Sequence, residues 1–255
     1  MQAEPASAEG RLLLGRALLA SQDPAGALIE LDRAKQLGAT ENDLAIPFAR
    51  ALAMTGRTKD VVDRLGGVNL PDPKQQADLR VEVAMALLDQ GQLKRADEAV
   101  AAALRADATH PVARLMAARF TASRGELDAA SQQTEALLAE NPKNAAALHL
   151  KGELLLVGGK DTAAAAKIFE TALAADPKYV PAHLALMKIS ARSNDVPSYE
   201  RHVQAMQAVL PKHPETMFAE IQLALAKSDL PAAKERSERL LLLAPDNSPR
   251  PVLRA

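Results

Sequence analysis

The chain has 255 residues, of which 48% are hydrophobic and only 2% aromatic, with no Cys or Trp. Lys and Arg number 31 against 32 Asp and Glu, so no net charge draws the chain toward nucleic acid or an anionic membrane. The lack of Cys excludes disulfides, thiolate nucleophiles and Cys-ligated metals. The apolar residues are mostly Ala and Leu, which favour helices, and runs typical of strands are missing, so the composition predicts an all-α fold.

The predicted helices follow one another in pairs. In the fourth pair, the first helix is "PVARLMAARFTASRG", Gly125 makes the turn, and the second helix ends before Pro142. Proline lacks the N–H that an interior helical turn needs, so it separates one pair from the next. We expect an N-terminal tail at 1–7, seven units, and the truncated start of a further unit at 248–255. The expected units are 8–41, 42–76, 77–110, 111–144, 145–179, 180–213 and 214–247.

A common period of 34 or 35 residues runs through the chain, and it is typical of stacked repeats. It relates four prolines, Pro142, Pro177, Pro211 and Pro245, and three glycines, Gly56, Gly91 and Gly125. It also relates two series of mostly small residues. The first-helix series is Gly15, Ala49, Ala84, Ala118, Gly152, Met187 and Ile221. The second-helix series is Ala27, Val61, Ala96, Ala130, Ala165, Tyr199 and Ala233.

The small residues are expected to let the two backbones of a pair approach closely. Ala130 and Ala233 should therefore be buried where paired helices meet, whereas Phe169 should face the next unit. The sixth unit has Met187 and Tyr199 at these positions, which argues against equally close packing there.

These features resemble those of tetratricopeptide-repeat (TPR) proteins. The match is best in 145–177, which contains "LHLKGELLL", Ala165, Phe169, Ala172 and "ADP". The resemblance covers about 240 residues. It implies a right-handed superhelical solenoid of about seven helix pairs, acting as a non-enzymatic scaffold whose concave face binds protein or peptide partners.

A narrower resemblance links 12–39 and 49–65 to the TPR-repeat lipoproteins of PEP-CTERM/exosortase systems. It implies an envelope or exopolysaccharide-associated assembly, and a periplasmic or outer-membrane lipoprotein, with a cytoplasmic location as the alternative. Members of that family begin with a lipoprotein signal and a lipidated cysteine, and this chain has neither, so the resemblance implies that these residues are an internal or truncated piece. No apolar stretch approaches the length of a membrane-spanning helix. A second alternative is the regulatory array of a larger glycosyltransferase or protease, with the catalytic domain outside this chain.

No catalytic constellation is recognised, so neither an enzyme nor a cofactor is predicted. "GGKDT" at 158–162 resembles the end of a phosphate-binding loop, but Leu154 replaces the first glycine and Asp161 replaces the magnesium-binding Ser or Thr. We interpret it as a turn between helices. The five histidines lack metal-ligand spacing and are interpreted as surface or groove residues, so no metal site is predicted. They are His110, His149, His183, His202 and His213.

The residue after each first-helix small position is expected, as the TPR resemblance implies, to line the concave face. This series is Arg16, Arg50, Met85, Arg119, Glu153, Lys188 and Gln222. An apolar floor is predicted from Leu12, Leu115, Leu184 and Phe218. Because Arg can grip carboxylates with two donors, the hypothesis is a groove for an acidic peptide, a C-terminal carboxylate or an anionic polysaccharide. The alternative is that the basic residues arise by chance and are neutralised by neighbours such as Glu153 or Asp89.

Overall fold

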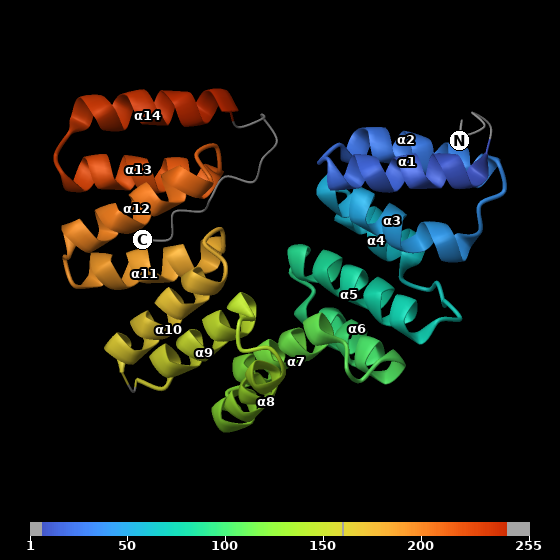
Figure 1. Ribbon diagram of the computed structural model, residues 1–255, viewed down its shortest axis with the longest axis horizontal. Coiled ribbons are helices and arrows are strands. Elements are labelled where there is room, and N and C mark those ends of the chain that lie inside the picture. The colour runs from blue at the N-terminus through green and yellow to red at the C-terminus, as the bar shows by residue number, and fades with distance from the viewer. Residues whose placement is uncertain (1–6, 160, 244–255) are drawn as a thin grey trace. The chain divides into compact units, whose positions relative to one another are not determined.

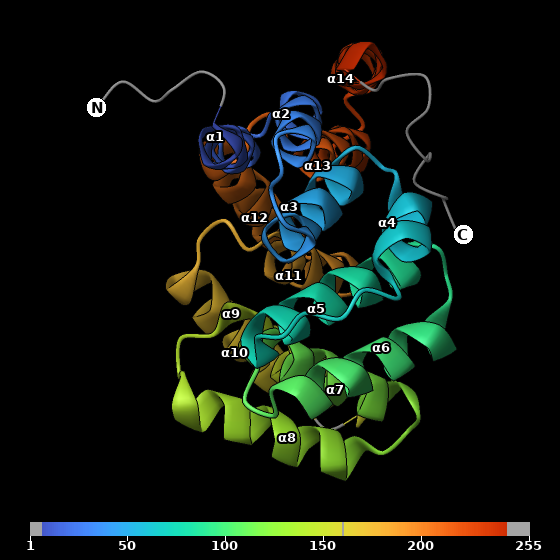
Figure 2. The same ribbon diagram turned by 90° about the vertical axis from the view of Figure 1, so that its right-hand side faces the viewer.

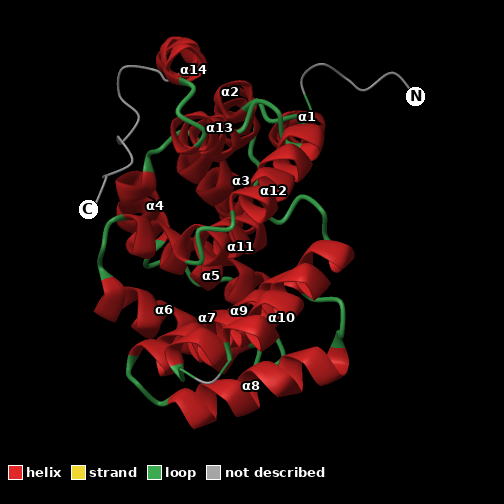
Figure 3. Cartoon of the chain, turned by 90° about the vertical axis from the view of Figure 1, so that its left-hand side faces the viewer, coloured by secondary structure: helices red, strands yellow, loops and turns green. Residues whose placement is uncertain are grey.

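The computed structural model describes residues 7–159 and 161–243, and in these ranges it contains fourteen α-helices and no strand (Figures 1 and 3). The predicted all-α class is confirmed. Most of the expected tail at 1–7 and all of 248–255 lie outside the described residues. The helices are α1 (Ala8–Ala20), α2 (Pro24–Gln36), α3 (Glu41–Met54), α4 (Thr58–Leu65), α5 (Pro73–Asp89), α6 (Leu93–Ala106), α7 (Pro111–Ser123), α8 (Leu127–Glu140), α9 (Ala145–Val157), α10 (Thr162–Ala175), α11 (Val180–Arg192), α12 (Val196–Val209), α13 (Pro214–Ala226) and α14 (Leu230–Leu243).

The chain divides into two compact units, 1–129 (unit 1) and 130–255 (unit 2). In unit 1 the odd-numbered helices, which we call first helices, contact one another in the order α1, α3, α5 and α7. The even-numbered second helices pack beside them, α1 on α2 and α5 on α6 most extensively, as can be followed in Figure 2. Fully buried side chains such as Leu31, Leu52 and Leu79 form the core between the helices.

In unit 2, α9 packs on α10, α11 on α12 and α13 on α14, and α10 and α12 contact the following first helix. Among the described residues, no two of the first helices α9, α11 and α13 pack closely against each other. The pair α11/α12, which carries Met187 and Tyr199, makes fewer close backbone contacts than α9/α10. The looser packing that the sequence predicts for the sixth helix pair is therefore observed.

Each turn within a pair uses one residue with a left-handed backbone. At Gly56, with φ of 73°, the glycine N–H bonds to Ala53 O and the next N–H bonds to Leu52 O, which is the Schellman arrangement. Gly91, Gly125 and Gly159 have the same conformation, so the predicted turns are confirmed. Three further residues with positive φ take the equivalent place in the other turns, namely Gln22, Asn194 and Ser228.

The small first-helix residues do allow close approach. A Cβ added to Gly152 would lie 2.4 Å from Cε1 of Phe169, and one added to Gly15 would lie 2.9 Å from Cδ2 of Leu31. Phe169 therefore packs against the first helix of its own pair, a contact that the expectation that it faces the next unit did not include. Ala130 and Ala233 are buried, as expected.

Candidate functional site

The first helices of unit 1 enclose an open groove with a volume of about 690 Å³. Residues of α1, α3 and α5 line it, because these helices contact one another in order and their exposed faces adjoin. Ile46 and Met54 supply apolar surface. The charged and polar residues that line it include Arg16, Asp43, Arg50, Gln75, Asp78 and Glu82.

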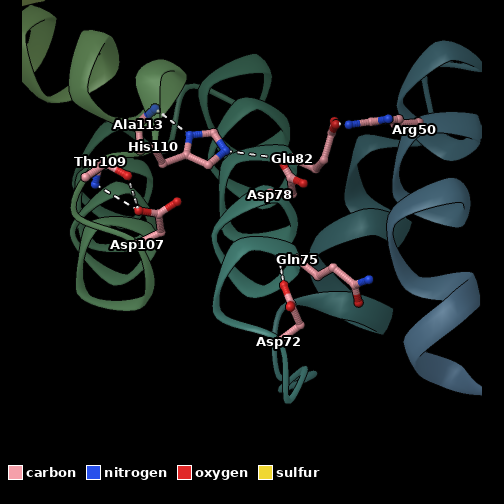
Figure 4. A network of polar contacts seen from close by, with 9 residues as sticks. All are labelled: Arg50, Asp72, Gln75, Asp78, Glu82, Asp107, Thr109, His110 and Ala113. Carbon is pink, nitrogen blue, oxygen red and sulfur yellow. Dashed lines mark hydrogen bonds and ion pairs between the residues drawn. The ribbon is translucent and has the colours of Figure 1, made fainter.

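The two arginines of this groove are already engaged. Nε of Arg50 lies 2.7 Å from Oε1 of Glu82, so the ion pair joins α3 to α5 (Figure 4). The Arg16 guanidinium donates to the main-chain oxygen of Asp43 at 3.4 Å. With the carboxylates of Asp43, Asp78 and Glu82 beside them, the groove presents both signs of charge.

A histidine holds one of these carboxylates in place. His110 is the N-cap residue of α7 and is only 8% exposed, and its Nδ1 accepts the N–H of Ala113, 3.2 Å away. Nε2 of the neutral ring therefore carries the proton, and it donates to Oδ1 of Asp78 at 3.0 Å (Figure 4). The ring thus links α5 to α7 at the groove edge. On the preceding turn, hydrogen bonds from the Thr109 hydroxyl and N–H hold the pKa of Asp107 below its usual range.

Two pockets of unit 2 lie on either side of α11. The pocket between α9, α10 and α11 has a volume of about 530 Å³ and the pocket between α11, α12 and α13 about 400 Å³. Leu184 and Lys188 line both pockets, so they form the ridge between them. Further apolar lining residues are Leu156, Val157 and Ile189 on one side and Met187, Tyr199 and Phe218 on the other.

Two cations beside the pockets of unit 2 differ from the two groove arginines of unit 1, because they have no partner among the described residues. Lys188 and Arg192 are exposed, and neither side chain has a hydrogen bond or ion pair with any residue that the structure describes. Two of the nearby carboxylates have such contacts. Glu153 lies 3.3 Å from Nδ1 of His149, and Asp195 caps α12 by accepting from Ser198, which lowers the pKa of Asp195.

The structure places the predicted groove residues in several different surroundings. Arg16 and Arg50 line the groove of unit 1, and Leu184, Lys188 and Phe218 line the pockets of unit 2.

The remaining three lie elsewhere. Leu12 belongs to the core of unit 1, and Leu115 and Arg119 are half-buried on α7 and do not line these cavities. Sequence reasoning missed Glu82 and Asp78 as groove residues and His110 as a helix cap, although the Pro that follows His110 marks a helix start.

No group of three or more His, Asp or Glu side chains in 7–159 and 161–243 is placed to hold a metal ion. Within the same ranges, no helix has both the length and the apolar character needed to cross a membrane.

Comparison with known proteins identifies the class of fold. Residues 87–154 match a family model described as "Tetratricopeptide repeat". Among solved structures, a thermophilic TPR protein from Thermus thermophilus is 19% identical with a TM-score of 0.56, over 67% of this chain and 93% of that chain. PilW, a type IV pilus biogenesis factor, is 16% identical with a TM-score of 0.52, over 94% of both chains.

A third similar structure is a monomeric mutant of IFIT1 with Gppp-AAAA, 15% identical with a TM-score of 0.67, over 92% of this chain and 59% of that chain. No curated protein sequence matches the chain. The fold of the chain is therefore similar to that of TPR proteins, and residues 87–154 match the repeat-family model. None of these findings supports the narrower resemblance to the PEP-CTERM-system lipoproteins.

Proposed function

We propose that the chain is a scaffold that binds protein or peptide partners in the grooves of its first helices and catalyses no reaction. The observation that carries the proposal is the pair of neighbouring pockets beside α11, where apolar side chains and unpartnered cations share one surface. Volumes of 400 to 530 Å³ are in the range of pockets that hold ligand groups. Burying apolar side chains of a partner there would supply affinity, and the charges would fix its register.

The division into seven repeats at the expected boundaries is part of this proposal. It is supported by the seven equivalent left-handed turn positions. The helix α5 begins at Pro73, ahead of the expected boundary between 76 and 77, so the third repeat would start with an extended first helix.

The charge of the ligand is proposed separately for unit 1 and for unit 2. Lys188 and Arg192 support an anionic ligand in unit 2, such as an acidic peptide segment, a C-terminal carboxylate or an anionic polysaccharide. In unit 1 the Arg50–Glu82 ion pair neutralises the arginine, so a ligand there would need both signs of charge. A basic stripe of Arg16, Arg50, Arg119 and Lys188 stays a hypothesis.

The biological setting rests on the sequence resemblance alone. A place in an envelope or exopolysaccharide-associated assembly is proposed from residues 12–39 and 49–65. The alternative, a regulatory array of a larger enzyme, would use the same grooves with a catalytic domain as the partner.

The test is selection of peptides from a displayed random library on the full chain, followed by calorimetric titration of the selected peptides. Groove variants Arg50→Glu and Lys188→Glu are compared with Arg105→Glu and Lys167→Glu, which make the same charge changes at exposed positions of second helices. We expect at least one groove variant to weaken binding about tenfold, and the controls to change it less than about twofold. Selection of no peptide, or equal losses in groove variants and controls, contradicts the proposal.

A further inference from the structure

We propose that the two pockets of unit 2 recognise an extended peptide in which one acidic side chain is flanked on both sides by apolar side chains. This inference rests on the proposed function and specifies its ligand. The acidic side chain would meet Lys188 on the ridge between the pockets, and the apolar side chains would enter the pockets on either side of α11.

The pocket between α9 and α11 offers apolar surface that the described part of the chain leaves uncovered. Val157 ends α9 and is 70% exposed, and Leu156 and Ile189 line the same cavity. The ring of Phe169 forms its buried wall, because it is held against Gly152. An apolar side chain of a partner would remove this surface from water.

The pocket between α11 and α13 exists because this pair departs from the small-residue pattern. Met187 is 3% exposed and fills the helix interface, and half-buried Tyr199 lines the pocket at the position that Ala165 takes in the preceding pair. The larger side chains accompany the looser packing of α11 on α12. Phe218 on α13 forms the opposite wall, so the cavity is open and mainly apolar.

The charges around the pockets specify where a carboxylate can bind. Lys188 and Arg192 are one helical turn apart on α11, and like charges at this spacing repel each other slightly. A carboxylate beside Lys188 would relieve that repulsion and gain an ion pair. At the outer sides, Glu153 lines one pocket, and Asp195 and Glu215 line the other. These carboxylates disfavour further acidic groups, so the ligand has a central acidic residue and is not an acidic run.

The width of α11 sets the spacing of the anchors, because the two pockets lie on either side of this helix. An α-helix with its side chains is about 10–12 Å wide. In an extended strand-like peptide, which advances about 3.3 Å per residue, side chains four residues apart lie on one face at a separation of about 13 Å, which is comparable with that width. The acidic residue, two positions from each apolar residue, lies between them on the same face.

The probe is a short fluorescein-labelled peptide with Leu-Ser-Glu-Ser-Leu at its centre, titrated with the full chain by fluorescence polarisation. Three comparison peptides replace Glu by Gln, both Leu by Ser, or both Leu by Glu. We expect the Gln peptide to bind about three- to fivefold more weakly and the two peptides without Leu at least about tenfold more weakly. Raising the salt concentration should shrink the difference between the Glu and Gln peptides.

A charge swap makes the test independent of folding. Lys188→Glu should weaken the Glu peptide and strengthen a Lys-substituted peptide, whereas Lys167→Glu should do neither, and circular dichroism should show unchanged helicity in both variants. Three results would each overturn the inference. They are equal binding of the Glu and Gln peptides, stronger binding of the peptide in which both Leu are Glu, and a Lys188→Glu variant that does not come to prefer the Lys-substituted peptide. In those cases library-selected peptides that still respond to the groove variants would leave the proposed function standing.

Discussion

The grooves of the two units are built from the same kind of helix pair but present different surfaces. In unit 1 the first helices touch one another, and polar pairs such as Arg50–Glu82 and His110–Asp78 bridge them. In unit 2 the first helices stand apart, and apolar pockets with unpartnered cations separate them. The repeat therefore fixes where a groove forms, and the side chains at a few positions determine what can bind in it.

Side-chain size accounts for part of this difference. The buried face of α3 includes Ala45, Ala49 and Ala51, which allow neighbouring backbones to approach. The corresponding faces of α11 and α13 carry larger groups, among them Met187 and Met217. Within unit 2 the same contrast separates the closely packed pair α9/α10 from the looser pair α11/α12.

The largest expected effect comes from removing the aromatic ring at the centre of the close pair. Phe169 is fully buried against Gly152 and His149, so Phe169→Ala should cost about 3–5 kcal/mol of stability. Tyr199→Ala should cost clearly less, because Tyr199 is half-buried beside an open pocket. Urea unfolding followed by circular dichroism measures both. Equal losses would show that the two pairs do not differ in packing.

An intermediate effect is expected from adding volume to the close pair. Ala165 is fully buried at the position that Tyr199 occupies in the next pair, so Ala165→Leu should destabilise the chain by about 1–3 kcal/mol. Ala174→Leu, at an exposed position of the same helix, is the control and should change stability little. If thermal unfolding of the Ala165→Leu variant matches that of the control, the helix interface is not tightly packed there.

A smaller effect of opposite sign is expected at the turns that lack glycine. Ser228 has φ of 59°, a conformation that costs an ordinary residue about 1–2 kcal/mol, so Ser228→Gly should stabilise α13/α14 by up to about 1 kcal/mol. Asn194→Gly should gain less, because Asn tolerates this conformation. Differential scanning calorimetry would contradict this reasoning if Ser228→Gly lowered the melting temperature.

The smallest effect is a dependence on pH that belongs to the loose pair. Burial, and then the neighbouring His183 and Arg201, lower the pKa of His202 below its ordinary value of 6.5. As pH falls, His202 therefore binds a proton at a higher pH in the unfolded chain than in the folded chain. The free energy of unfolding should decline from about pH 6.5 downward until the folded-state pKa is passed. His202→Gln should flatten this part of the stability profile. An unchanged profile in urea unfolding would exclude His202 as its source.

The sequence alone was sufficient for the helices, the all-α class and four of the turns. These features depend on local residue preferences and on the period of the sequence, so the residues of each helix pair are enough to predict them. The turns at Gln22, Asn194 and Ser228 share the period but not the glycine, and for that reason residue type did not reveal their conformation.

Only the tertiary structure decided which groove residues are free to bind. Arg50 and Glu82 are 32 residues apart, and the ion pair forms only because α3 and α5 lie side by side. Leu12 and Leu184 were predicted alike from the repeat, yet Leu12 is buried in the core and Leu184 lines two pockets. The physical reason is that exposure depends on the separation of neighbouring helices, and many side chains outside any single motif set that separation.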